Sequence, residues 1–250
     1  AENLNDTEAT MPPIFEFTLS ETVGSKLSVY PKDVEMIVDT IRLSEMRQRT
    51  VEDLAGMFGG TGQSFISLHQ FHEALTNMLR TSEETNQVWL EDDEYEFVYA
   101  VLVGVFHAMQ RDSHSEPNPS VNVDELVGAF AVFVGSGTKS EKLASIFDVF
   151  DSDRDGLINR EDLWRYIRCV LASLCHLTMV VPGRDLMGFD ENATDSSFNR
   201  VVQQASLEVI EDIWQYRNIL YPENVMDGDD GNISFETFAS WYTHGGYEMA

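Results

Sequence analysis

The feature that most constrains this chain is an acidic stretch with a glycine in its middle, DSDRDGLINRED, which runs from Asp151 to Asp162. Its first three aspartates stand at alternating positions, Asp151, Asp153 and Asp155. Like charges so close together repel one another unless a hard divalent cation lies between them. Gly156 follows, where a sharp turn needs a positive φ that other residues adopt only with strain. The stretch therefore predicts a cation site made of oxygen ligands rather than a solvated acidic turn.

Apolar residues at helical spacing stand on both sides of this stretch. Upstream they are Leu143, Ile146, Phe147 and Phe150, and downstream they are Leu163, Tyr166, Ile167, Val170, Leu171 and Leu174. Both sets follow the pattern of a helix that buries one face. The sequence therefore predicts a helix, a loop and a second helix.

The segment FDVFDSDRDGLINREDLWRYI resembles the EF-hand calcium-binding superfamily. In that family a loop holds one ion through side chains at positions 1, 3 and 5, a backbone carbonyl at 7, a side chain or water at 9 and a carboxylate at 12. The metal ligands that the resemblance implies are Asp151, Asp153, Asp155, Leu157 through its carbonyl, Asn159 and Asp162. Calcium is the implied ion, and magnesium could take the same site. The family's usual last ligand is a glutamate. The shorter Asp162 is therefore expected to weaken calcium binding and to reduce the selectivity for calcium over magnesium.

A second stretch, MFGGTGQSFISLHQF, fits the same loop register without the charges. Ile66 then stands where Ile158 stands in the acidic loop. The ligand positions hold Gly59, Thr61, Gln63, Ser67 and Gln70, with no carboxylate among them. The GGTGQS motif lacks the Gly-Lys-Ser/Thr ending of a nucleotide-binding phosphate loop. His69 and His72 lack a third ligand and are interpreted as surface or packing residues.

Two more stretches fit the register around the apolar residues Val121 and Ile233. The loop at 114–125 ends in Glu125 but carries Pro119 where the turn needs glycine, so it is either a weak ion site or a structural hand. The loop at 226–237 has its aspartates one residue out of phase, so it is either a rearranged ion site or an acidic structural partner. We favour the structural partner. The other ligand positions hold His114, Glu116 and Asn118 in the former, and Met226, Gly228, Asp230 and Thr237 in the latter.

The resemblance implies an all-α fold of two paired EF-hand lobes with an N-terminal arm, one well-formed calcium loop and three degenerate hands. We expect the first hand to pair with the second and the third with the fourth, because a lone hand leaves its loop backbone and apolar face uncovered. The expected domains are a largely irregular N-terminal arm at 1–30, a degenerate pair at 31–137 and a second pair at 138–250. Residues 81–96 are expected to form an acidic connector.

Composition narrows the classes of partner. The formal net charge of minus 27 argues against nucleic-acid binding, which needs basic surface to neutralise phosphates. No run of 18 apolar residues exists, so no transmembrane segment is expected. Cys169 and Cys175 fall on different faces of one predicted helix and are expected as buried or half-buried thiols in a reducing, cytoplasmic compartment.

These observations indicate a calcium sensor or calcium-responsive regulatory module, which binds a protein partner or regulates an attached domain. A basic or amphipathic helix is the expected partner. The alternative is a constitutive EF-hand interaction scaffold with a single structural calcium or magnesium ion. An enzyme is not expected, because no activated nucleophile motif occurs and cation binding accounts for the paired carboxylates. The sequence leaves the oligomeric state open.

Overall fold

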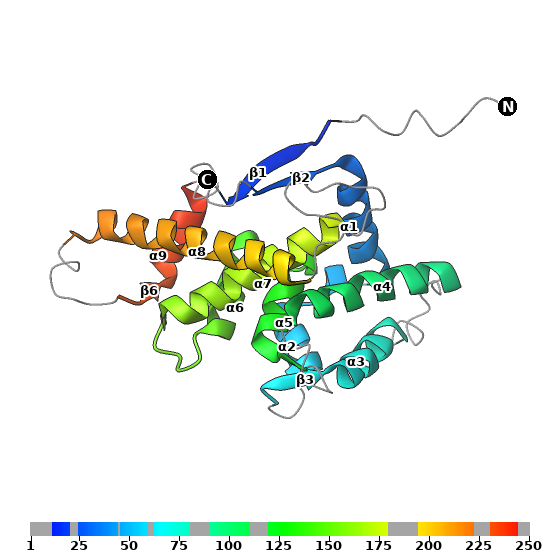
Figure 1. Cartoon of the computed structure of the whole chain (residues 1–250). Helices are drawn as coiled ribbons and strands as arrows, with labels where there is room; N and C mark the ends of the chain where they lie inside the picture. The colour runs from blue at the N-terminus through cyan, green and yellow to red at the C-terminus, as the bar shows by residue number, and fades with distance from the viewer. Residues whose placement is uncertain are drawn as a thin grey trace.

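A computed structural model of the chain describes residues 12–20, 25–44, 46–59, 63–80, 91–110, 120–179, 195–222 and 231–244. Helices dominate these residues, so the predicted all-α class is confirmed (Figure 1). The helices are α1 (Pro31–Leu43), α2 (Val51–Gly59), α3 (Leu68–Arg80), α4 (Asp92–Met109), α5 (Val123–Phe130), α6 (Lys139–Phe150), α7 (Arg160–Met179), α8 (Asp195–Leu220) and α9 (Phe235–Thr243). The strands are β1 (Phe15–Ser20), β2 (Ser25–Val29), β3 (Phe65–Ser67), β4 (Ser120–Asn122), β5 (Leu157–Ile158) and β6 (Ile233–Ser234). None of the described helices is long and apolar enough to cross a bilayer.

Two short antiparallel ribbons join the loops in pairs. Strand β3 pairs with β4, and Ile66 stands opposite Val121. Strand β5 pairs with β6, and Ile158 stands opposite Ile233. All four of these residues are buried. The predicted pairing of the first loop with the second and of the third with the fourth is confirmed, together with the apolar residues at its centre.

The N-terminal segment is more regular than its sequence suggested. Strands β1 and β2 form an antiparallel hairpin in which Phe17 stands opposite Leu27, and the hairpin packs on α8 and α7 (Figure 1). The expectation of a largely irregular arm at 1–30 is therefore wrong for these strands. Apolar and polar residues alternate in FEFTLS and SKLSV with the period of a strand. Leu27 is 1% exposed, and burying it helps to offset the entropy lost when the segment is ordered.

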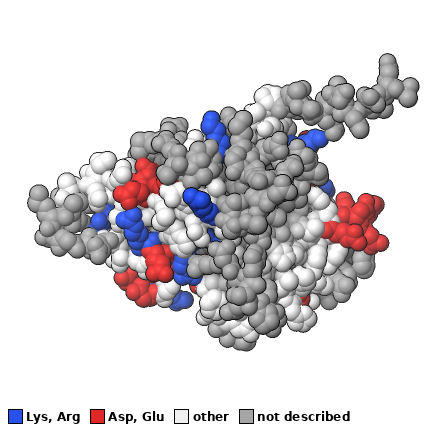
Figure 2. All heavy atoms as spheres, in the orientation of Figure 1, with Lys and Arg blue, Asp and Glu red and all other residues white. Residues whose placement is uncertain are grey.

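The acidic run at 91–94 begins a helix instead of belonging to a connector, which corrects the expectation for residues 81–96. Glu91 is the N-cap of α4, and its backbone N–H donates to the carboxylate of Glu94 at 3.2 Å. Negative side chains are favourable beside the positive end of a helix dipole. In Figure 2 a cluster of acidic side chains lies at the right-hand edge of the molecule, where α4 ends on that side of Figure 1. Residues 81–90 lie outside the described ranges.

Aromatic rings fill the core between the first two hands. Phe71 stacks on Phe106 with ring centroids 4.6 Å apart, and it meets Phe130 edge to face at 5.8 Å. Helix α7 of the third hand packs against α4 and α5 of the second hand as well as against α8. The buried apolar residues of both halves form one continuous core. The division of the chain after residue 137 stays a prediction.

Helices α4 and α7 cross closely because Gly104 has no side chain. A Cβ at this position would collide with the imidazole ring of His176. Burial, followed by the nearby His107, lowers the pKa of His176 to about 4. The imidazole is therefore neutral at physiological pH and packs as part of the interior.

Both cysteines lie buried in α7 as free thiols, as their spacing predicted. Burial raises the pKa of Cys175 to about 12. A thiol reacts as its thiolate, so Cys175 is expected to be inert at neutral pH.

Candidate metal site

The loop between α6 and α7 turns through two residues with positive φ. Helix α6 ends at Phe150, and Asp151 is its C-cap. Arg154 has a φ of 58° and Gly156 a φ of 80°. A Cβ at residue 156 would meet nothing within 4 Å, so glycine serves the backbone conformation there and not the packing. The chain then enters β5 and the ribbon with β6.

The side chains of Asp151, Asp153 and Asp155 converge inside this loop. Each offers a carboxylate oxygen within 4.8 Å of the oxygens of the other two. Asp151 is 6% exposed, and its oxygens accept hydrogen bonds from the backbone N–H groups of Asp155 at 3.2 Å and Gly156 at 2.9 Å. Asp151 also stands at the C-terminal end of α6, where the helix dipole is negative. Carboxylates crowded at such an end suit a hard divalent cation, so the donor set fits calcium or magnesium.

A small cavity of about 150 Å³ lies beside the aspartates. Its lining consists of Phe150, Ser152, Asp153, Asp155, Leu157, Asn159, Asp162 and Asn232. The structure therefore brings the remaining predicted ligands to the same cavity as two of the clustered aspartates. Ligation by this set stays a prediction.

Asn232, from the fourth loop, is a lining residue that sequence reasoning missed. The predicted pairing of the third and fourth loops could have indicated it, because Ile158 stands opposite Ile233 in an antiparallel ribbon. Extending that pairing by one residue sets Asn159 opposite Asn232. The third loop's cavity is therefore closed in part by its partner loop.

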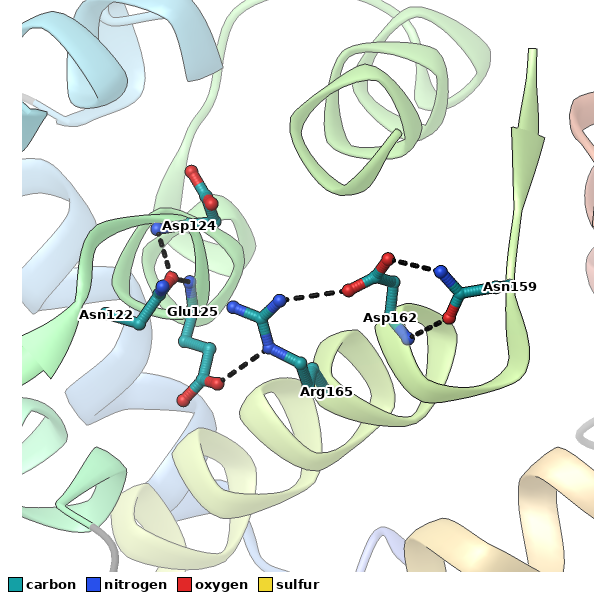
Figure 3. A network of polar contacts seen from close by, with 6 residues as sticks. All are labelled: Asn122, Asp124, Glu125, Asn159, Asp162 and Arg165. Carbon is teal, nitrogen blue, oxygen red and sulfur yellow. Dashed lines mark hydrogen bonds and ion pairs between the residues drawn. The ribbon is translucent and has the colours of Figure 1, made fainter. Parts of the chain in front are cut away.

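Asp162, the predicted last ligand, is held by other side chains (Figure 3). Its Oδ2 accepts a hydrogen bond from Nδ2 of Asn159 at 2.7 Å, and its Oδ1 accepts one from Nη1 of Arg165 at 2.9 Å. Arg165 also donates from Nε to Glu125 at 3.0 Å. Burial by itself would lower the pKa of Arg165, but hydrogen bonds and charges from Glu125 and Asp162 outweigh burial and raise that pKa. The guanidinium therefore stays charged beside the loop.

All four loops cap their outgoing helix in the same way. The side chain at the ninth loop position accepts a hydrogen bond from the backbone N–H at the twelfth, which satisfies one of the free donors at a helix start. The capping pairs are Ser67 with Gln70 (3.3 Å), Asn122 with Glu125 (3.2 Å), Asn159 with Asp162 (2.9 Å) and Ser234 with Thr237 (3.3 Å). The capped helix start is thus shared by the loops whatever their ligand chemistry.

The first loop closes through amides and hydroxyls. Oε1 of Gln70 accepts from the backbone N–H of Ser67 at 2.9 Å and from its hydroxyl at 2.8 Å. Nε2 of Gln70 donates to Oε1 of Gln63 at 2.9 Å. The fifth, ninth and twelfth positions of this loop therefore bind one another directly.

Several predicted ligand positions lie outside the described residues, so ion binding by the loops at 114–125 and 226–237 stays a prediction. These positions are Thr61, His114, Glu116, Asn118, Met226, Gly228 and Asp230.

Comparison with known proteins finds similarity over half of the chain. The B subunit of calcineurin from Naegleria gruberi is 28% identical over 125 residues, which are 50% of this chain and 51% of that protein. The corresponding calcineurin protein of Candida glabrata is 27% identical over 120 residues, which are 48% of this chain and 49% of that protein. The chain thus matches about half the length of these relatives. No profile of a known family and no solved structure matches the chain. Together with the paired loops, these similarities relate the chain to the EF-hand superfamily of calcium-binding proteins.

Proposed function

We propose that this chain is a calcium-responsive regulatory module whose ion site is the loop from Asp151 to Asp162. The convergence of Asp151, Asp153 and Asp155 carries the proposal, because their oxygens lie within 4.8 Å of one another between two helices. A bound cation relieves their repulsion and supplies energy to fix the angle between α6 and α7. The similarity to the calcineurin proteins supports a regulatory role.

The ligands in this proposal are oxygen atoms of the loop. The three clustered aspartates supply carboxylates, and Leu157 supplies its carbonyl. Asn159, just before α7, and Asp162, in its first turn, complete the set. Calcium accepts six to eight oxygens in flexible geometry, whereas magnesium requires a compact octahedron. We infer that calcium is the main ion and that magnesium competes for the same site.

The partner in this proposal is a protein segment, a basic or amphipathic helix. The relatives are named as subunits, which indicates that they are parts of larger assemblies. Apolar side chains stand exposed on α8, where Leu207 is 50% and Ile219 is 77% exposed, and on α1, where Val38 is 54% exposed. The net charge of minus 27 favours basic segments. We infer a binding role without catalysis, in the cytoplasm.

A calcium titration of the chain by calorimetry, with magnesium present, tests the site. We expect one binding event with a dissociation constant of roughly 0.1 to 10 micromolar, the range of regulatory sites. The double substitution Asp153→Asn and Asp155→Asn should abolish it while keeping the size of both side chains. Asp148→Asn is the matched control, because Asp148 is exposed on α6 and does not line the cavity. Calcium binding that survives the double substitution would refute the assignment.

A constitutive scaffold with one structural ion is the second candidate. The hydrogen bonds among Gln63, Ser67 and Gln70 favour it, because they join described positions of the first loop through its own side chains. Hydrogen exchange with and without calcium separates the two functions. A regulatory module changes the protection of α8 and α1, where the exposed apolar residues lie. In a scaffold, calcium changes only the hydrogen exchange of the ion-binding loop and the melting temperature of the chain.

A further inference from the structure

Arg165 stands between the last carboxylates of two loops (Figure 3). Its Nε lies 3.0 Å from Oε1 of Glu125, and its Nη1 lies 2.9 Å from Oδ1 of Asp162. The side chains of Arg165, Glu125 and Asp162 are 19%, 5% and 20% exposed. Charge-assisted hydrogen bonds of this kind are stronger than neutral ones, and partial burial limits the screening that weakens surface ion pairs.

The backbone fixes this arrangement from both sides. Asp162 and Arg165 are three residues apart on α7, so they share one face of the helix. Glu125 lies in the first turn of α5, where Asn122 accepts hydrogen bonds from the N–H groups of Asp124 at 2.9 Å and Glu125 at 3.2 Å. Helices α5 and α7 pack against each other. Glu125 and Asp162 both occupy the twelfth loop position, so Arg165 bridges equivalent ends of the second and third loops.

Both oxygens of Asp162 already accept hydrogen bonds in this arrangement. Oδ1 accepts from Arg165 and Oδ2 accepts from Nδ2 of Asn159. A metal ion that approaches either oxygen therefore meets a competing donor. The positive charge of Arg165 also repels the ion, and the hydrogen bond to Glu125 keeps the guanidinium in place.

We propose that Arg165 acts as an internal cation that holds the last carboxylates of the second and third loops together and competes with the metal ion for Asp162. Ion binding in the third loop then loosens the contact of Arg165 with Asp162, and the guanidinium turns more fully to Glu125. Arg165 is a positioning residue that sets ion affinity and carries the binding event to α5. The inference rests on the proposed ion site at Asp151 to Asp162.

The first test is the calcium affinity of Arg165→Met, measured by calorimetry on the whole chain. Methionine keeps an unbranched apolar stem but removes both hydrogen bonds and the charge. We expect roughly tenfold tighter binding, the size expected when a competing charge-assisted hydrogen bond is lost. Arg160→Met is the control, since Arg160 lies at the start of the same helix and pairs with Glu211 instead. It removes the same charge, and a smaller gain is expected from it.

Glu125→Gln tests the bridge from the other end. The amide cannot share the charge of Arg165, so the guanidinium should bind Asp162 more firmly and calcium should bind roughly threefold more weakly. In the Arg165→Met background the same substitution should have little effect. An equal effect in both backgrounds would show that Glu125 acts by its charge at a distance, which would overturn the bridge.

A readout at α5 separates a relay from a local competition. Calcium should change the hydrogen exchange of the Asp124 and Glu125 amides in the wild-type chain but not in Arg165→Met. If Arg165→Met does not fold, Arg165→Lys replaces it, because a single ammonium group lacks the fork that reaches two carboxylates. This variant should also bind calcium more tightly than the wild-type chain. Unchanged or weaker calcium binding in the folded Arg165 variant would overturn the inference. Absence of calcium binding by the wild-type chain would instead refute the proposed function itself.

Discussion

In the first loop the outgoing helix α3 is held by amides and hydroxyls, whereas in the third loop the outgoing helix α7 begins beside clustered carboxylates. Both loops pair through a buried isoleucine, and both cap the helix from the ninth position. The difference lies in the groups that face the loop interior. Gln63 and Gln70 hydrogen-bond to each other, while Asp151, Asp153 and Asp155 bring three like charges close together. Pairing and capping therefore set the shape of a loop, and its interior side chains set its need for an ion.

The largest expected effect comes from the ribbon isoleucines. Ile66→Ala and Ile158→Ala each remove a side chain that is 2% exposed, and each should lower the free energy of unfolding by about 2–4 kcal/mol. Saturating calcium should stabilise Ile66→Ala as much as the wild-type chain but Ile158→Ala less, because Ile158 lies between the proposed ligands Leu157 and Asn159 and its loss weakens ion binding. Thermal unfolding with calcium and with a chelator measures both. Equal stabilisation of the two variants by calcium would contradict the contrast between the loops.

The second effect concerns the helices behind the loops, where α7 crosses α4. His176 has a pKa of about 4 in the folded chain against 6.5 for an unperturbed histidine, so the unfolded chain binds more protons between these values. Above pH 6.5 His176 does not reduce the free energy of unfolding. As pH falls from 6.5 toward 4, its contribution lowers that free energy by up to about 3 kcal/mol. Denaturant unfolding at several pH values should show a shallower loss for His176→Phe. If His176→Phe lost unfolding free energy with falling pH as steeply as the wild-type chain, other groups would be responsible for the acid sensitivity.

Third in size is the turn at Gly156, whose φ is 80°. Gly156→Ala should cost about 1–2 kcal/mol of unfolding free energy, because alanine resists this conformation even though the space is open. The matched control is Gly56→Ala, on the exposed part of α2, where a Cβ also meets nothing within 4 Å. That change should stabilise the helix by about 0.5–1 kcal/mol. Chemical unfolding compares the two, and destabilisation of equal size would mean that the turn's backbone is not the cause.

The smallest effect is expected in the first loop. Gln70→Ala removes the hydrogen bonds to Ser67 and Gln63 and should cost about 1 kcal/mol. Calcium affinity should not change, because the first loop takes no part in the proposed site. Gln63→Ala removes only one of these bonds and should cost less. If Gln70→Ala changed the calcium affinity, the first and third loops would be coupled.

Local patterns were sufficient to predict the acidic loop, its two helices and the residues at the centre of each ribbon. Ile66, Val121, Ile158 and Ile233 could be found because each stands at a fixed offset within its own loop. Such offsets involve neighbours in the chain. They did not by themselves fix the pairing of the loops, which was expected because a lone hand leaves its loop backbone and apolar face uncovered.

Contacts between distant residues could not be predicted in the same way. The ion pair of Arg165 with Glu125 joins residues 40 apart, and nothing in either helical pattern marks these two charges among many others. The hairpin at β1 and β2 was missed because five or six alternating residues are a weak signal beside a polar start. The start of α4 was missed because an acidic run resembles a solvated connector until its position at the helix end is known.

The shared cap at the ninth position also bears on how such a chain tolerates mutation. A loop that relied on its ion to start the outgoing helix would lose that helix with the first lost ligand. Here Ser67 and Ser234 start their helices through the same hydrogen bond that Asn159 makes in the acidic loop. Ligands can therefore be replaced one at a time while the helices remain, so gain and loss of ion sites are small steps in sequence rather than changes of fold.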